Sequence, residues 1–217
     1  MGQNKKLNLE ILDWSFVYDK NQIEELNTKE LVPKMVTRRR LTRAAKIAIY
    51  LASQVNYSNE RIIFGSSFGE LLATDTILNS ISDKEPISPT HFQNSVYNTA
   101  ISYLSILSGN DNEIMTISSG DDTSKNIFKS GAIKAIDEDE LLLMGIETLN
   151  IPSISEVNKC IDYLECGVAV RVKITDEKAN LQLDATNNLK IPNSLLELYN
   201  VAKSCENGRK NIVEVAI

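Results

Sequence analysis

Histidine and cysteine are scarce in this sequence of 217 residues, which contains one histidine, His91, and three cysteines. The odd number of cysteines, with neither C-x-x-C nor zinc-ligand spacing, argues against a disulfide framework and against a zinc site. We therefore expect Cys160, Cys166 and Cys205 to be reduced thiols, with no metal and no cofactor bound. His91 is expected to be a capping or surface residue.

Long apolar runs are also lacking. No stretch approaches the roughly 18 residues that a membrane-spanning helix needs, and the first ten residues have no apolar signal core. Gly2 follows Met1, but Lys6 stands where a myristoylation signal requires Ser or Thr. These observations predict a cytoplasmic protein without a membrane partner.

Basic residues are outnumbered by acidic ones. Lys and Arg total 23 against 29 Asp and Glu, which gives a net charge of −6. This balance argues against electrostatic binding of the whole protein to nucleic acid or to an anionic membrane. The length and the 42% apolar content fit one soluble domain over residues 1–217.

Helical and extended patterns alternate along the chain, which predicts an α/β fold; the clustering of strands near the end predicts a mixed sheet. Helices are expected over 38–55, from the Ser67 turn to Asn79, from Ser88 to Leu107, over 123–136, and from Asn193 to Ser204. Strands are expected over 7–17, 61–64, 113–118, 140–146, 166–174 and 211–217, and residues 180–185 are a candidate partner for 166–174. Residues 19–37 are predicted to be an irregular lead-in.

Side chains at several helix starts have the chemistry of caps. Ser67 and Glu70 have the spacing of a capping box, and Ser88 precedes a proline in the first turn. Asp121 and Asp122 are well placed to cap the helix over 123–136. These positions set the expected helix starts.

Four segments, in order, resemble the amino-terminal half of the β-ketoacyl synthases, which have the thiolase-like fold. They are RRLTR at 39–43, IFGSSFGE at 63–70, ISPTHF and SVYN at 87–98, and the strand–turn–helix over 114–136. The last of these resembles the element that carries the nucleophilic cysteine. The resemblance covers residues 33–149 and is most specific at 88–98; residues 150–217 match no motif and are expected to complete the sheet.

Departures from the family pattern bear directly on activity. Tyr97 stands where the family usually has histidine, and Ser102 replaces a glycine. The turn reads Ser118-Ser119-Gly120-Asp121-Asp122, without the cysteine that would carry the acyl chain as a thioester. The resemblance also implies a histidine pair, or a His/Asn pair, from a carboxy-terminal half that this sequence does not match. We therefore expect no catalytic residue, and we interpret Ser119, Gly120 and Asp121 as a degenerate nucleophile turn.

The expected helix from Ser88 to Leu107 carries candidate interface residues. Its apolar stripe includes Phe92, and its stripe of small polar residues consists of Ser95, Asn98, Ser102 and Ser105. The resemblance implies that this helix packs on a partner synthase and shapes its acyl tunnel, with Tyr97 at the pocket floor. The alternative is an internal helix that faces its own sheet, with Tyr97 in the core.

Four arginines at the start of the helix over 38–55 also have two interpretations. Arg38, Arg39, Arg40 and Arg43 are either a solvated helix end with internal salt bridges, or a docking site for an acidic acyl carrier protein or a charged subunit.

Three functions stay open at this point. The first is a non-catalytic subunit of the chain-length-factor type, paired with a full-length β-ketoacyl synthase in fatty-acid, polyketide or aryl-polyene-like biosynthesis. The second is a stand-alone binding or scaffold module with the half-fold. The third is an acyltransferase or hydrolase that uses Ser119 or a cysteine.

Overall fold

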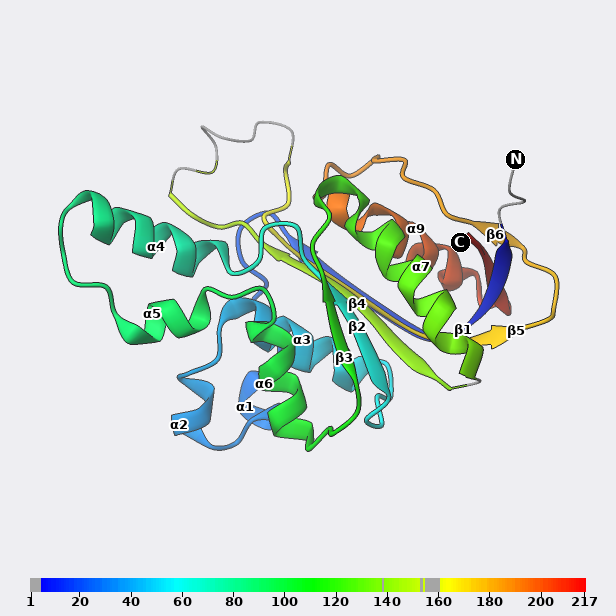
Figure 1. The fold of residues 1–217 in the computed structure, drawn as a ribbon, viewed down its shortest axis with the longest axis horizontal. Helices are drawn as coiled ribbons and strands as arrows, with labels where there is room; N and C mark the ends of the chain where they lie inside the picture. Colours follow the sequence, from blue (N-terminus) through cyan, green and yellow to red (C-terminus); the bar gives the residue numbers. More distant parts are fainter. Residues whose placement is uncertain (1–4, 138, 153, 155–160) are drawn as a thin grey trace.

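One mixed sheet of seven strands runs through the part of the chain that the structure describes (Figure 1). The computed structural model describes residues 5–137, 139–152, 154 and 161–217. The strand order is β3-β2-β4-β5-β1-β7-β6. The strands are β1 (Lys6–Asp19), β2 (Arg61–Gly65), β3 (Ile114–Ile117), β4 (Leu141–Thr148), β5 (Glu165–Thr175), β6 (Leu181–Gln182) and β7 (Asn211–Ala216).

Strand directions divide the sheet into two parts. β3, β2 and β4 are parallel, whereas β4, β5, β1 and β7 pair in antiparallel fashion. The expected pairing of residues 180–185 with 166–174 is wrong, because β4 and β1 already occupy both edges of β5. The two-residue strand β6 pairs with β7 in parallel instead and forms the edge of the sheet.

Helices cover both faces of the sheet. They are α1 (Thr28–Leu31), α2 (Met35–Arg38), α3 (Arg43–Gln54), α4 (Leu71–Ser82), α5 (Pro89–Asn94), α6 (Thr99–Ser108), α7 (Thr123–Lys134) and α9 (Leu196–Ser204). Short 3-10 turns lie at Gly120–Asp122, Ala135–Asp137, Asn193–Leu195 and Cys205–Asn207. Side chains of α3 and α6 share one hydrophobic core cluster, and side chains of α7 and α9 belong to a second cluster. None of the described helices is long and apolar enough to cross a membrane.

Helices α4 and α5 project beyond the sheet as a pair (Figure 1). We call residues 71–94, which comprise both helices and the loop between them, the arm. Neither helix has a buried residue, although the two pack on each other. The arm therefore contributes almost nothing to the core and presents most of its surface outward.

The central strand β4 is buried along all eight residues, since helices pack on both of its faces. Its neighbour β2 ends at Gly65, where α7 approaches closely. A Cβ built at this glycine would lie 2.5 Å from Cδ1 of Ile127. The absence of a side chain at Gly65 thus lets α7 lie directly against the sheet.

Two long helices that the apolar period predicts are broken in the structure. The helix expected over 38–55 divides into α2 and α3, because the Thr42 side chain accepts a hydrogen bond from the Ala45 N–H (3.1 Å) and caps α3. The helix expected from Ser88 to Leu107 divides into α5 and α6 around residues 95–98. The lead-in over 19–37 contains α1 and part of α2, and is therefore less irregular than predicted.

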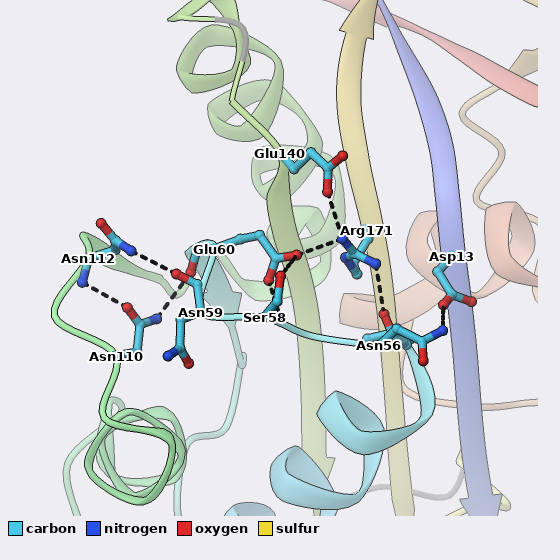
Figure 2. A network of polar contacts seen from close by, with 10 residues as sticks. Asp13, Asn56, Ser58, Asn59, Glu60, Asn110, Asn112, Glu140 and Arg171 are labelled. Atoms are coloured by element: carbon cyan, nitrogen blue, oxygen red, sulfur yellow. Dashed lines mark hydrogen bonds and ion pairs between the residues drawn. The ribbon is translucent and has the colours of Figure 1, made fainter.

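A polar network joins the loops at the amino-terminal ends of the parallel strands (Figure 2). The Arg171 guanidinium contacts Glu60 at 2.7 Å and Glu140 at 2.6 Å. Asn56 donates to Asp13 at 2.7 Å. These contacts link β1, β2, β4 and β5 at one end of the strands. The carboxyl-terminal ends of β2, β3 and β4 meet at the opposite end, where the candidate site lies.

Candidate functional site

The turn after β3 is the position at which the resembled synthases carry their nucleophile. Ser119, Gly120 and Asp121 follow the strand there, and all three are exposed. Gly120 has a φ of 57°, a left-handed conformation that side-chain-bearing residues rarely adopt. A Cβ built on it would meet nothing within 4 Å. The described residues place no hydrogen-bonded base at the Ser119 hydroxyl, so nothing in them activates it.

No side-chain capping hydrogen bond forms at the start of α7, and Thr123 instead holds the turn that precedes the helix. The Ser119 N–H donates to Oγ1 of Thr123 at 3.0 Å, and the Thr123 hydroxyl donates to the Gly120 carbonyl at 2.7 Å. Asp122 directly precedes α7 and Asp121 lies in the 3-10 turn before it, but neither side chain makes the predicted capping hydrogen bond. The capping box predicted at Ser67 is not formed, since α4 begins at Leu71 without a side-chain capping hydrogen bond. Ser88 and Pro89 do lie at the start of α5 as predicted, although the Ser88 side chain makes no capping hydrogen bond.

A buried carboxylate, Glu147, organises the Gly-rich turn between β2 and α4. It accepts hydrogen bonds from the Ser66 hydroxyl (2.8 Å), the Ser67 N–H (2.6 Å) and the Phe68 N–H (3.3 Å). The hydroxyl of Ser194 donates a fourth, at 2.6 Å. Burial raises the pKa of Glu147 above the usual range of a glutamate, and these four hydrogen bonds oppose the shift. Glu147 therefore fixes the direction in which the chain enters the arm.

A second buried pair ties the degenerate turn to the start of α9. Ser124 on α7 donates to Glu197 on α9, and both side chains are buried. Nearby, Asn193 donates to Asp121 at 3.2 Å. The sequence patterns did not single out Glu147 or Glu197. A glutamate that follows an apolar run in a buried strand, as Glu147 does in β4, could have indicated the first of them. Buried acidic residues need such partners, so their presence marks a polar cluster.

Exposed apolar side chains gather on and around the arm. Of 15 large apolar side chains that are exposed among the described residues, eight lie between residues 68 and 97. They are Phe68, Leu72, Leu78, Ile81, Ile87, Phe92, Val96 and Tyr97. Exposed apolar side chains that gather on one segment often mark interaction sites.

The predicted interface residues are separated by the break between α5 and α6. Phe92, on α5, is 68% exposed, and Asn98 is exposed in the connecting turn. Ser95 donates internally to the Phe92 carbonyl at 2.9 Å. On α6, Ser102 is half-buried and the Ser105 hydroxyl donates to a carbonyl of the following loop at 2.8 Å. The continuous stripe of small residues predicted for one helix is therefore not formed.

Tyr97 lies over the Gly-rich turn that precedes the arm. Its hydroxyl donates to the Ser67 carbonyl at 3.3 Å. Gly69 has a φ of 62°, and a Cβ built there would lie 3.1 Å from Cδ1 of the Tyr97 ring. Tyr97 is 44% exposed, so it is not in the closed core.

The four arginines do not form one helical surface. Arg38 ends α2 and donates to the carbonyls of Val32 (2.8 Å) and Pro33 (2.7 Å). Arg43 begins α3 and makes a bidentate ion pair with Glu165, whose side chain is 2% exposed.

Arg39 and Arg40 lie between α2 and α3, and both are exposed. No salt bridge within the described residues involves either guanidinium. They are thus the two members of the predicted arginine cluster that are available to a partner.

The two cysteines that the structure describes are in environments that keep their thiols protonated. Cys166 and Cys205 are buried free thiols, and Cys160 lies outside the described residues. Burial is the largest cause that raises the pKa of Cys166, with the neighbouring Glu147 and Glu165 adding to it. Burial also raises the pKa of Cys205 to about 11. Thiols held protonated are poor nucleophiles. Among the described residues, no group of three or more His, Cys, Asp or Glu could hold a metal ion.

The mixed sheet with helices on both faces, and with a strand–turn–helix at its carboxyl edge, defines a thiolase-like α/β domain. The family model for the β-ketoacyl synthase N-terminal domain matches residues 12–211, and the chain belongs to this family. The match extends beyond 33–149 at both ends. A comparison with curated protein sequences finds no match.

Solved structures agree on the fold. The chain is similar to a chain of the ketosynthase ApeO in complex with its chain length factor ApeC from Xenorhabdus doucetiae, with a TM-score of 0.68 and 20% identity over 91% of this chain and 92% of that one. It is also similar to the ishigamide ketosynthase/chain length factor, with a TM-score of 0.61 and 11% identity over 80% of this chain and 63% of that one. A β-ketoacyl synthase from Burkholderia phymatum has a TM-score of 0.54 and 10% identity, over 78% and 60% of the two chains.

Proposed function

We propose that this chain is a non-catalytic subunit of the chain-length-factor type that pairs with an active β-ketoacyl synthase. The observation that carries the proposal is the turn between β3 and α7. Where an acyl-carrying thiolate is required, the turn has Gly120 and an exposed Ser119 without a base. The sequence contains a single histidine, so no histidine pair can stabilise an enolate.

The arm supports a heterodimer. Its exposed apolar side chains are costly to leave in water, and burying one such side chain fully contributes about 1.5–3 kcal/mol. Two of the similar structures, with TM-scores of 0.68 and 0.61, hold a ketosynthase with its chain length factor. We infer that a synthase subunit covers the arm and the neighbouring surface of α6, including Phe92, Tyr97 and Ser102.

Arg39 and Arg40 are proposed to meet acidic groups when the assembly forms. Both guanidiniums are exposed on a chain whose net charge is −6. Their partner is either an acidic acyl carrier protein or an acidic surface of the synthase subunit, and both would be attracted electrostatically.

Co-expression with a full-length β-ketoacyl synthase encoded beside this chain tests the pairing. The two chains should co-elute in size-exclusion chromatography, and the length distribution of the acyl products should change when this chain is omitted. In the variant Ile81→Glu, a charge replaces an arm side chain that is 57% exposed in the free chain. This variant should abolish co-elution because the carboxylate would be desolvated in the interface.

Ile133→Glu is the matched control. Ile133 is 52% exposed but lies on α7, away from the arm, so this variant should still co-elute. Co-elution that survives Ile81→Glu, or that is lost equally in both variants, would contradict the proposed surface. Condensation of malonyl and acyl groups by the isolated chain would contradict the non-catalytic role.

A further inference from the structure

A cavity of about 480 Å³ is lined by residues of the arm, of α3 and of the chain beside them. Its walls come from the starts of α3 and α4, from α5, and from the chain at the ends of β4 and β5. The volume is that of pockets that hold small molecules. Leu41 and Leu72 line it beside polar side chains that include His91 and Asn94.

One ion pair in the cavity wall is already satisfied. Arg43 binds Glu165 through Nε and a terminal nitrogen, at 2.8 and 2.5 Å. The Ile23 N–H donates to the same carboxylate at 2.8 Å, and Arg43 donates to the Ile23 carbonyl at 2.8 Å. This pair is neutral as a unit and has little capacity left for a ligand.

Two further groups in the same cavity lack a charged partner. Glu70 is 6% exposed, and within the described residues only its Oε1 accepts a hydrogen bond, from Thr42 at 2.5 Å. Lys46 is half-buried and forms no ion pair with a described residue. Burial, then the charge of Arg43, lowers the pKa of Lys46, whereas Glu165 acts in the opposite direction. No salt bridge within the described residues joins Lys46 to Glu70, although both line the cavity.

We propose that the cavity binds a small zwitterion with a short methylene chain, whose ammonium group donates to Glu70 and whose carboxylate is held by Lys46. A carboxylate and an ammonium that are taken out of water each need an opposite charge. A ligand with only one charge would satisfy only one of them. The apolar side chains Leu41 and Leu72 offer a surface for the methylene groups. The proposal does not rest on the proposed synthase partner, although arm residues such as Leu72 line the cavity.

Calorimetric titration of the full chain with β-alanine, 4-aminobutyrate and 5-aminopentanoate tests the proposal. At least one of these ω-amino acids should bind, and bind at least tenfold more tightly than butyrate or butylamine, which carry one charge each. Glu70→Gln and Lys46→Met should each weaken binding tenfold or more. Lys125→Met, which changes an exposed lysine on α7, should leave affinity unchanged.

Several results would overturn the assignment. Binding of none of the three ω-amino acids would do so, as would affinities that Glu70→Gln and Lys46→Met leave unaltered. If butyrate bound as tightly as 4-aminobutyrate, the cavity would be an anion site. If butylamine bound as tightly as 4-aminobutyrate, it would be a cation site. Circular dichroism of each variant verifies that it is folded, so that a loss of binding reports on the cavity.

Discussion

Replacing Glu70 by glutamine is expected to stabilise the protein at alkaline pH and to have little effect at acidic pH. Glu70 is buried at the start of α4, and the Thr42 hydroxyl is its one hydrogen-bond donor within the described residues. Burial raises the pKa of Glu70 to about 7, although that hydrogen bond acts in the opposite direction. The glutamine side chain has nearly the same shape, can accept the same hydrogen bond and cannot ionise.

The sign and size of the effect follow from proton linkage. The pKa of Glu70 rises from 4.5 to about 7 on folding, so between these values the folded state binds more protons than the unfolded state. The free energy of unfolding therefore falls as pH rises through this window and is level above it. A shift of about 2.5 pKa units at about 1.4 kcal/mol per unit corresponds to about 3 kcal/mol. Glu70→Gln should thus gain about 3 kcal/mol over the wild type at pH 8 and almost nothing at pH 4.

Urea denaturation at pH 4, 6 and 8 measures this difference, and thermal melting gives a second readout. About 3 kcal/mol corresponds to a Tm difference of about 6–12 °C for a chain of this size. The comparison cancels the titration of Glu147, which both proteins share. Glu85→Gln changes an exposed residue after α4 and is the control. The difference in stability between this variant and the wild type should not grow with pH. A Glu70→Gln variant whose stability relative to the wild type is the same at pH 4 and pH 8 would refute the reasoning.

Two further predictions concern contacts of the site. Arg43→Leu should lower the free energy of unfolding by about 3–5 kcal/mol in urea denaturation, because it leaves the Glu165 carboxylate buried without its cation. Adding Glu165→Leu should recover part of this loss of stability, and a loss below about 1 kcal/mol in Arg43→Leu would argue against a buried ion pair. Gly120→Cys, assayed alone with acyl and malonyl thioesters, should stay inactive since only His91 is available, and measurable condensation would contradict the non-catalytic assignment.

The buried carboxylate Glu147 links two parts of the proposed assembly. It holds the Gly-rich turn that directs the arm, and it accepts from Ser194 beside the degenerate turn. Glu147 thus joins the residues beside the degenerate turn to the turn that directs the arm through one buried hydrogen-bonded group.

Local patterns in the sequence were sufficient for the main elements of the fold. The short apolar run at 61–64 and the run at 140–146 are β2 and β4, and the helix expected over 123–136 is α7 with a 3-10 turn after it. The resemblance on 33–149 led to the family that the match on 12–211 shows. Such elements are predictable because burial on one or both faces imposes a period on neighbouring residues.

Tertiary structure alone decided where the helices break, how β6 pairs and which charges are buried. The predicted helices run through Thr42 and through residues 95–98, whereas in the structure the Thr42 cap begins α3 and α6 begins only at Thr99. Burial in the fold raises the pKa of Glu70, and the hydrogen bonds that Glu70 and Glu147 accept come from groups 28 to 81 positions away along the chain. Desolvation is a property of the folded environment, so no local pattern of residues could reveal it.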